Sequence, residues 1–354
     1  MPRPRTASPT QATVARAAGV SVPTVSKALR GDPSISERTR LLVHETAARV
    51  GYAPPGPAGG ASREASRAQV HVVFDTVDNA YTSQVLAGML ASAREVGSAL
   101  QVEHLGTPAD HLGDEGTVLT EQLVEDVCGR GDALILVTTP VSDRIVRCCE
   151  ERLVPLLVID PASDTPQGVI TLSATNWRGG VQATTHLLGL GHRRIAVVCG
   201  PEHSLPSVER LAGFRSACAD ARVEVDDALV RPGRYDYASG LEQGRELLRL
   251  PEPPTAVLAL NDTIAVGVLE AARRHGLRVP EDLSVVGFDD SSIAALSSPL
   301  LTTVRQPLHD IGVEAVRIVT QARASGRVGG SPVEMQTSLV VRSSTGPAPH
   351  RPRT

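Results

Sequence analysis

The stretch from Val14 to Leu29 constrains the fold of this chain most strongly, because it predicts two short helices that meet at a tight turn. Apolar residues recur at helical spacing on both sides of Gly19, which suits the left-handed backbone that such a turn needs. Ser21 can cap the second helix through its side-chain oxygen, and Pro23 is tolerated in the first turn. The pattern is typical of a helix-turn-helix, whose second helix reads the major groove of DNA.

Two helices of an ordinary core could share this pattern, so the residues that follow it matter. A third helix is predicted from Ser34 to about Val50, because Ser34 and Glu37 stand at the spacing of a capping box and Gly51 can stop the helix. Three helices would then enclose a small core. We expect its inward-facing residues to be Val14, Ala17, Ala18, Val25, Ala28, Leu29, Ile35, Leu42, Val43, Ala47 and Val50.

Between Ala17 and Pro54, the segments AAGVSVPTVSKALRG, ISERTR and GYAP closely resemble the headpiece of the LacI family of bacterial repressors. The resemblance is specific and nearly gapless, and it implies binding to double-stranded operator DNA. In that arrangement Val22, Pro23 and Lys27 meet base edges, while Thr24 and Ser26 contact phosphates or bases. The DNA-binding residues expected on this basis are Val22, Pro23, Thr24, Ser26, Lys27, Arg30, Tyr52, Ala58 and Ala61.

Charge is distributed unevenly along the chain. Residues 1–63 contain nine arginine or lysine side chains and three acidic ones, whereas the whole chain has a formal net charge of −4. A basic headpiece on an acidic body favours contacts with DNA phosphates at one end and repulsion of DNA elsewhere. Lys27 is the only lysine of the chain, which singles it out within the second helix.

The clearest domain boundary lies at residues 54–68, where Gly, Pro and Ser dominate and no apolar period persists. We therefore expect a DNA-binding headpiece at residues 1–53, a hinge or linker at 54–68, an effector-binding and dimerisation domain at 69–345, and a disordered tail at 346–354. No stretch is long and apolar enough to cross a membrane. The N-terminus lacks the apolar core of a signal peptide, so we expect a cytoplasmic protein.

Beyond the linker, short apolar runs alternate with amphipathic stretches, which predicts parallel sheets covered by helices on both faces. The body is too long for one such unit, so we expect two lobes. The predicted strands are Val70–Phe74, Leu100–His104, Ala133–Val137, Pro155–Ile159, Arg194–Cys199, Ala256–Leu260 and Leu283–Phe288. The predicted helices are Thr82–Val96, with Val85, Leu86, Met89, Leu90 and Ala93 on its inner side, Arg178–Leu190, Val208–Ala219, Tyr237–Leu250 and Ile264–His275.

Several predicted strands end in a polar residue, namely Asp75, Asp160, Asn261 and the pair Asp289–Asp290. Each of these alone could simply begin a loop or cap a helix. Open parallel sheets, however, bind ligands beyond the carboxyl ends of their strands. Converging carboxylates and an amide suit a ligand rich in hydroxyl donors, such as a sugar. Three aromatic residues outside the strands could stack on a sugar ring or serve as partly buried anchors: Trp177, Tyr81 and Tyr235.

The rest of the chain resembles the effector domain of the same family, through the segments ATNWRGG, LLGLGHRRIAVVCGP, SVERLAGF, NDTIAVGVLEAARRHGLRVPEDLSVVGFDD and SPLLTTVRQPL. That domain is similar to periplasmic sugar-binding proteins, with two lobes, three crossovers and the effector in the cleft. The fold class implied is an all-α helix-turn-helix headpiece plus an α/β periplasmic-binding-protein-like effector domain of two parallel-sheet lobes. The resemblance implies that Arg210, Asn261 and Asp289 hold effector hydroxyls, with Tyr235 as a stacking ring and Leu308 as an apolar contact.

One loop of the first lobe departs from the family pattern. Where relatives read P-D-x-x-N-P-F, this chain has Asp75, Asn79 and Tyr81, with Asp75 in the place of a common proline. That departure alters one wall of the cleft. The complete effector-binding set that we expect is Asp75, Asn79, Tyr81, Asp160, Trp177, Arg210, Tyr235, Asn261, Asp289 and Leu308.

The sequence contains no glycine loop for phosphates, no HExxH and no GxSxG, so we expect neither an enzyme nor a bound cofactor or metal. The five cysteines match no metal or redox spacing and are expected to be buried thiols. We predict a homodimeric repressor controlled by a sugar or glycoside inducer. The alternatives are a corepressor such as a purine, or a periplasmic-type solute-binding protein. The tail has no heptad of the kind through which relatives tetramerise.

The linker departs most from the family, and this departure concerns the centre of the operator. In relatives the residues after GYxP form a short helix on DNA, and a leucine wedges into the minor groove. Here Ala58 aligns with the family's small residue and Ala61 with the leucine. The surrounding glycines and prolines oppose a helix by about 1 and 3 kcal/mol each. An alanine methyl is also a poor wedge for unstacking a base step.

We predict that Ala61→Leu, alone or with Gly59→Ala and Gly60→Ala, increases both operator affinity and DNA bending. We also predict that the hinge is weakly ordered and that the centre of the operator is less kinked than in relatives. The inducer would then act by changing the spacing of the headpieces rather than by melting a hinge helix. Circular-permutation gels of the wild-type and variant complexes measure the bend. Strong bending by the wild-type chain that these substitutions do not increase would contradict the prediction.

Overall fold

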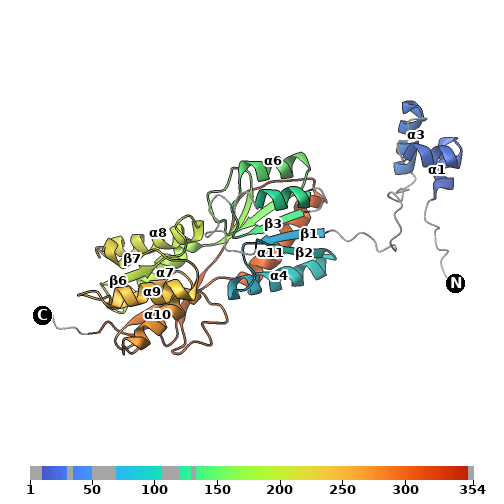
Figure 1. The fold of residues 1–354 in the computed structure, drawn as a ribbon. Helices are drawn as coiled ribbons and strands as arrows, with labels where there is room; N and C mark the ends of the chain where they lie inside the picture. The colour runs from blue at the N-terminus through green and yellow to red at the C-terminus, as the bar shows by residue number, and fades with distance from the viewer. Residues whose placement is uncertain (1–9, 30–34, 50–68, 106–119, 129–132, 350–354) are drawn as a thin grey trace, which may run out of the picture. The chain divides into compact units, whose positions relative to one another are not determined.

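The fold consists of two compact units, residues 1–66 and residues 67–354. In their described parts, the first contains helices only and the second contains two six-stranded sheets with covering helices (Figure 1). The predicted fold class is therefore confirmed, and the boundary between the units falls within the predicted linker. The structure, a computed structural model, describes residues 10–29, 35–49, 69–105, 120–128 and 133–349.

Each described helix of the headpiece begins after a hydroxyl residue that caps it. Thr10, Ser21 and Ser36 each accept a hydrogen bond on the side-chain oxygen from the backbone N–H three residues on, at 3.4, 3.2 and 3.2 Å. The predicted cap at Ser21 is confirmed, whereas the third helix is capped by Ser36 and the predicted Ser34 lies outside the described residues. Gly19 ends the first helix with a φ of 67°, the left-handed turn that the sequence predicts. The helices are α1 (Gln11–Ala18), α2 (Val22–Leu29) and α3 (Glu37–Arg49).

Two predicted core positions of the headpiece face solvent. Ala17 and Leu42 are exposed, whereas Ala15 and Thr46 are buried. A unit of three short helices buries only a narrow stripe of each. Val14, Val43 and Ala47 are buried as predicted, and the residues that complete the stripes on α1 and α3 are Ala15 and Thr46. The core consists of Val14, Ala15, Val25, Ala28, Val43 and Ala47, with Val20 and Ile35 packed against it.

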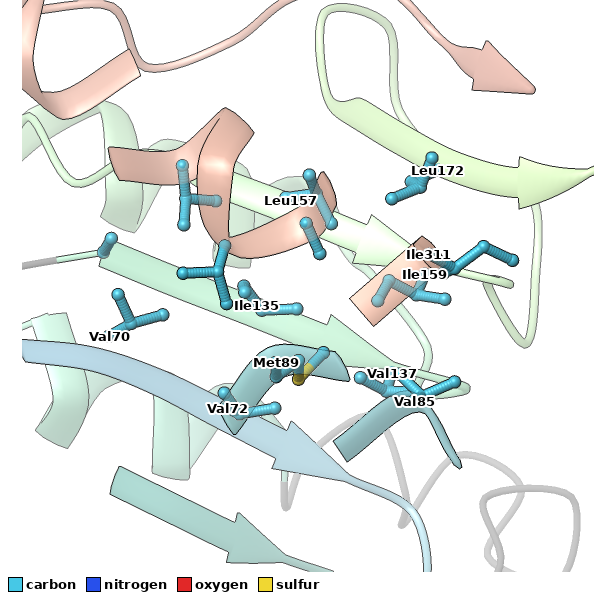
Figure 2. Packing of buried hydrophobic residues seen from close by; sticks show 14 of the residues in the cluster. Val70, Val72, Val85, Met89, Ile135, Val137, Leu157, Ile159, Leu172 and Ile311 are labelled. Atoms are coloured by element: carbon cyan, nitrogen blue, oxygen red, sulfur yellow. The ribbon is translucent and has the colours of Figure 1, made fainter. Parts of the chain in front are cut away.

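The first lobe of the second unit is a parallel sheet with helices on both faces. Its strands and helices are β1 (Gln69–Phe74), α4 (Ala80–Val96), β2 (Ala99–His104), a helix that includes residues 120–128, β3 (Ala133–Val137), α6 (Asp143–Glu151), β4 (Leu156–Ile159), β5 (Ile170–Ala174), α11 (Leu308–Ala324) and β11 (Val333–Met335). The strand order is β11-β5-β4-β3-β1-β2. Figure 2 shows Val72, Ile135 and Leu157 on the sheet face that packs against α4 and α11. The alternate side chains pack against α6 and residues 120–128 on the other face.

The second lobe repeats this layered arrangement (Figure 1). Its main elements are α7 (Asn176–Gly189), β6 (Ile195–Val198), α8 (Leu205–Asp220), β7 (Val230–Arg231), α9 (Tyr237–Leu248), β8 (Ala256–Ala259), α10 (Asp262–Arg274), β9 (Ser284–Asp289), β10 (Thr302–Arg305) and β12 (Ser338–Val340). The strand order is β12-β10-β9-β8-β6-β7, and only β12 runs antiparallel to its neighbour. One face packs against α7 and α8, and the other against α9 and α10.

The predicted strands and helices of both lobes are present, with bounds that differ by only a few residues. The sequence analysis did not identify β5, β7, β10, β11 and β12, because strands of two to five residues show too little period. It also did not identify the helices α6 and α11. Leu90 was expected on the inner side of α4 but is exposed, because Gly88 and Met89 are the buried residues there. All five cysteines are buried and none forms a disulfide, as predicted.

The chain passes between the lobes three times, after β5, β10 and β11. The first and third passages are joined, because the Thr337 backbone N–H donates to Thr175 Oγ1 at 3.0 Å. In the second passage, Gln306 Nε2 donates to Asp289 Oδ1 at 2.6 Å. The first and third of the segments about which the lobes could move are therefore hydrogen-bonded to each other, and the second is hydrogen-bonded to the end of β9.

The first residues of the predicted disordered tail, 346–349, contact the second lobe, whereas residues 350–354 of that segment lie outside the described residues. The Gly346 N–H donates to Ser284 Oγ at 3.1 Å, and the Ala348 N–H donates to the Leu190 carbonyl at 2.9 Å. His192 Nε2 lies 3.1 Å from the Gly346 carbonyl oxygen. These contacts satisfy buried polar groups of the lobe, so the domain extends at least to Ala348.

Gly88 and Gly312 let α4 and α11 approach closely, which leads to a prediction about stability. A Cβ at Gly88 would lie 1.9 Å from the His309 carbonyl oxygen. Alanine favours a helix over glycine by about 1 kcal/mol. Despite this preference, we expect Gly88→Ala to lower the free energy of unfolding by about 1–3 kcal/mol, because the α11 backbone must move.

Gly189→Ala is the matched control, since a Cβ at the end of α7 would meet nothing within 4 Å. This variant should be neutral or slightly stabilising. Urea denaturation of the full chain measures both free energies of unfolding. A Gly88→Ala protein as stable as the control would contradict the close packing of α4 on α11.

Candidate functional site

A cavity of about 620 Å³ lies between the two lobes, at the carboxyl ends of their parallel strands. Its volume is within the range of about 300–1,000 Å³ that is typical of small-molecule sites. Residues that follow parallel strands collect at this edge of a sheet. Most of the predicted effector-binding residues line the cavity, namely Asp75, Asn79, Tyr81, Asp160, Arg210, Tyr235, Asn261 and Asp289.

The first-lobe wall is built where three neighbouring strands end in register. β1, β3 and β4 pair in parallel, so Asp75, Thr138 and Asp160 follow them side by side, and all three line the cavity. Thr138 Oγ1 donates to Asp75 Oδ1 at 2.6 Å, and the Thr76 N–H donates to the same oxygen at 2.7 Å. The Asp75 carboxylate is thereby fixed in position.

Asp160 and Tyr81 pair on the same wall. The Tyr81 hydroxyl donates to Asp160 Oδ2 at 2.6 Å, and Asp160 Oδ1 is buried. Burial raises the pKa of Asp160, and burial together with the neighbouring carboxylate raises the pKa of Tyr81. The backbone of Asp160 is left-handed, with a φ of 45°, a conformation that the surrounding structure must impose. Asp160 and Tyr81 therefore form a hydrogen-bonded pair on this wall of the cavity.

The buried guanidinium of Arg210 organises the second-lobe wall. Arg210 is 3% exposed, and its Nε donates to Asn176 Oδ1 at 2.8 Å while its Nη1 donates to the Leu260 carbonyl at 2.6 Å. The guanidinium carbon lies 3.8 Å from the centroid of the Phe288 ring, a cation–π contact. Nη1 also lies 3.8 Å from Asp289 Oδ1. Contacts from several elements thus hold this cation in place.

Asp289 ends β9 and contacts the second passage between the lobes. Its Oδ1 accepts the hydrogen bond from Gln306, and its φ of 114° is unusual for a residue with a side chain. Burial raises the pKa of Asp289 to about 8, although the Arg210 guanidinium opposes the shift. Ligand donors placed against this carboxyl would favour its charged form.

Asn79 and Asn261 cap helices as well as lining the cavity. Asn79 Oδ1 accepts from the Thr82 N–H at 2.8 Å at the start of α4, and Asn261 Oδ1 accepts from the Ile264 N–H at 2.7 Å at the start of α10. Asn261 Nδ2 donates to the Tyr235 carbonyl at 3.3 Å. Their oxygens are therefore already used, so these side chains offer a ligand chiefly N–H donors.

Two residues of the predicted set lie outside the cavity lining. Trp177, in the first turn of α7, is 48% exposed, and its carbonyl lies against Gly213 of α8. Leu308 begins α11 and is 1% exposed, buried in the hydrophobic core between that helix and the first-lobe sheet. Each begins a helix whose packing turns the side chain away from the cleft, which the sequence pattern does not reveal.

Other lining residues were not singled out by the sequence pattern. Thr138 and Pro140 follow β3, Ser204 precedes α8 and Asp236 caps α9. The end of β3 was predicted correctly, but two threonines and a proline follow it instead of a carboxylate. Position after a buried parallel strand is the signal that would have found Thr138.

The headpiece presents part of the predicted DNA-binding set on the outer side of α2. Thr24 and Ser26 are half-buried, and Thr24 Oγ1 lies 2.8 Å from Ser21 Oγ within the helix cap. The hydroxyl of Thr24 is therefore shared with the start of α2. The exposed members of the set are Val22, Pro23 and Lys27. The members outside the described residues are Arg30, Tyr52, Ala58 and Ala61.

Two further features were searched for in the described ranges. No group of three or more His, Cys, Asp or Glu side chains there could hold a metal ion. No helix in the same part of the chain is long and apolar enough to cross a membrane.

Comparisons with known proteins match both units. Residues 12–55 match the family model of bacterial regulatory proteins, lacI family, and residues 184–345 match a periplasmic binding protein-like domain. The HTH-type transcriptional repressor CytR of Escherichia coli is 31% identical over 332 residues, which cover 94% of this chain and 95% of CytR.

Solved structures agree over nearly the whole chain. A complex of the transcriptional regulator CelR with cellobiose has a TM-score of 0.70 at 30% identity, covering 95% of this chain and 99% of that one. A Lac repressor dimer bound to operator and the anti-inducer ONPF has a TM-score of 0.70 at 27% identity, with the same coverage. The protein is a DNA-binding transcriptional regulator and not an enzyme. It belongs to the lacI family of bacterial regulatory proteins.

Proposed function

We propose that the protein is a repressor whose affinity for operator DNA falls when a sugar or glycoside binds in the cavity between the lobes. This proposal rests on the polar lining that both lobes contribute, with Asp160 from the first and Arg210 and Asp289 from the second. A ligand that touches both lobes can favour one arrangement of them over another, provided that its affinities for the two arrangements differ. Operator binding implies that the protein acts in the bacterial cytoplasm.

The chemistry of the lining suits sugar hydroxyls, which both donate and accept hydrogen bonds. Asp160 and Asp289 offer acceptor oxygens, and Arg210 offers donors. The rings of Tyr81 and Tyr235 line the same cavity and can pack against the apolar face of a sugar. The cellobiose in the similar CelR complex supports a carbohydrate of that kind.

A homodimer that binds an inverted repeat completes the proposal. Two headpieces related by a two-fold axis would place one α2 in each half-site. The similar Lac repressor structure is a dimer on its operator, which supports this arrangement. Exposed apolar residues that could meet a second copy are Leu90, Val96 and Val102 in the first lobe and Leu296, Leu300 and Val341 in the second.

Substitution of Lys27 tests whether α2 recognises the operator sequence. We expect Lys27→Ala to relax the preference at one base pair of each half-site and to weaken specific binding by about 1–3 kcal/mol, because the ammonium can donate to base-edge acceptors in the major groove. Affinities for operators with single-base changes measure this effect. Arg16→Ala on α1 controls for a general loss of positive charge. An equal loss of affinity for every DNA sequence would show that Lys27 contacts a phosphate group, and would contradict the predicted contact with a base edge.

Substitution of Asp289 tests whether a ligand in the cavity controls operator binding. We expect Asp289→Ala to bind operator normally but to lose its response to saccharide, since each charge-assisted hydrogen bond contributes about 1.5–3 kcal/mol. Asp164→Ala, exposed and outside the lining, is the control. Thermal shift of the full chain with small saccharides, cellobiose among them, identifies a ligand for calorimetry.

Unchanged saccharide affinity in Asp289→Ala would remove that residue from the site. An operator complex that becomes tighter with the saccharide would make the ligand a corepressor and reverse the proposed direction of control.

A further inference from the structure

Three of the five cysteines gather in the hydrophobic core of the first lobe. Cys128 belongs to the helix that includes residues 120–128, whereas Cys148 and Cys149 belong to α6. Both helices pack on the same face of the sheet. The Sγ atoms of Cys128 and Cys149 lie 3.6 Å apart, although 21 positions separate the two residues in the sequence. The fold thus brings together two thiols whose sequence spacing indicates no pairing.

The geometry of the cluster favours one pairing. A disulfide has an S–S distance of about 2.05 Å, so the sulfur atoms of Cys128 and Cys149 would have to approach by about 1.5 Å. Rotation of both side chains about their Cα–Cβ bonds moves each sulfur along an arc and can close this gap. Cys148 and Cys149 are consecutive in α6, where successive side chains point about 100° apart. A bond between these two neighbours would require α6 to unwind.

Cys128 also differs from an ordinary buried thiol in its ionisation. The hydrogen bond from Cys149 lowers the pKa of Cys128, and a hydrogen bond from Cys148 and the charge of Arg152 act in the same direction, although burial opposes the shift. Arg152 Nη1 donates to Cys148 Sγ at 3.1 Å, which places the guanidinium beside the cluster. The thiolate of Cys128 is therefore more accessible at neutral pH than that of a cysteine buried among apolar groups.

The two remaining cysteines provide a comparison within the same chain. Cys199 and Cys218 lie in the core of the second lobe, where burial raises the pKa of each to about 11. Such thiols stay protonated at neutral pH and react slowly with oxidants. Cys128 is 3% exposed whereas Cys149 is fully buried, so a small oxidant reaches Cys128 before Cys149.

We propose that Cys128 and Cys149 form an oxidisable dithiol, which a hydroperoxide converts into an intramolecular disulfide between the helix that includes residues 120–128 and α6. This modification site is separate from the effector site, because none of the three clustered cysteines is among the described residues that line the cavity. The disulfide would close a loop that contains β3 and Thr138 of the cavity wall. In a reducing compartment it would be transient, since cellular thiols reduce it again.

The reaction has two steps, written here for hydrogen peroxide. The Cys128 thiolate attacks one peroxide oxygen, so that an S–O bond forms, the O–O bond breaks and hydroxide leaves with the proton that Cys128 lost on ionising. The sulfur of Cys149 then attacks the sulfenic acid of Cys128. The S–S bond forms, the S–O bond breaks, and the proton of Cys149 leaves with the hydroxyl group as water. The two thiols give up two electrons, and the peroxide is reduced to two molecules of water.

Mapping of the oxidised thiols in the full chain tests the proposal. The reduced protein is treated at neutral pH with a modest molar excess of hydrogen peroxide, then with catalase, and is finally denatured in N-ethylmaleimide. We expect the wild-type chain to lose two of its five free thiols and to yield a peptide pair joined through Cys128 and Cys149 in mass spectrometry. Dithiothreitol should restore all five thiols, and Cys199 and Cys218 should be alkylated throughout.

Two serine variants locate the reaction. Cys128→Ser removes the shared partner, so we expect all four remaining thiols to survive the same treatment. Cys218→Ser is the control, because it removes a buried thiol outside the cluster and should still lose two thiols. Melting temperatures of the reduced proteins show whether either substitution alters the fold, and the peptide map of the wild-type chain tests the pairing independently of both variants.

Several results would overturn the proposal. Five intact thiols in the treated wild-type chain would show that the pair is not oxidisable by peroxide. A disulfide through Cys148, or between two chains on a non-reducing gel, would contradict the pairing of Cys128 with Cys149. Loss of two thiols in Cys128→Ser, or equal oxidation of Cys199 and Cys218 in the wild-type chain, would show that the cluster has no special reactivity.

Discussion

The burial of Arg210 is the interaction on which the effector site depends. A guanidinium removed from water must be compensated by acceptors, and its partners are the Asn176 side chain, the Leu260 carbonyl and the Asp289 carboxyl. These partners come from the start of α7 and the ends of β8 and β9. Because breaking a buried pair on one side leaves an uncompensated charge, Arg210 and the three strand and helix ends around it behave as one unit.

The same contacts reach the segments that connect the lobes. Asn176 follows Thr175 of the first passage, and Asp289 accepts its hydrogen bond from Gln306 of the second. A ligand that changes the hydrogen bonding of Arg210 or Asp289 therefore acts directly on the residues that hold the lobes together. Ligand binding can therefore change the relative stability of two arrangements of the lobes, which is what a conformational switch requires.

The ends of the strands could be predicted from the sequence because a buried parallel strand is an unbroken apolar run, and the polar residue after it stands out. Asp75, Asp160, Asn261 and Asp289 were found in this way, and all line the cavity. Trp177 and Leu308 could not be placed, since residue type and family pattern do not show where the first turn of a helix points. The prediction that Leu42 faces the headpiece core was wrong for a related reason, because the packing of three short helices decides which edge of each helix is buried.

Sugar and operator should oppose each other's binding if lobe movement links the cavity to the headpieces. Thermodynamic linkage makes this opposition reciprocal. Calorimetry of the full chain, alone and saturated with its operator, compares the affinity for the saccharide in the two states. We predict weaker saccharide binding to the DNA complex, by the same factor by which the saccharide weakens operator binding. Equal saccharide affinity with and without operator would contradict ligand-controlled repression.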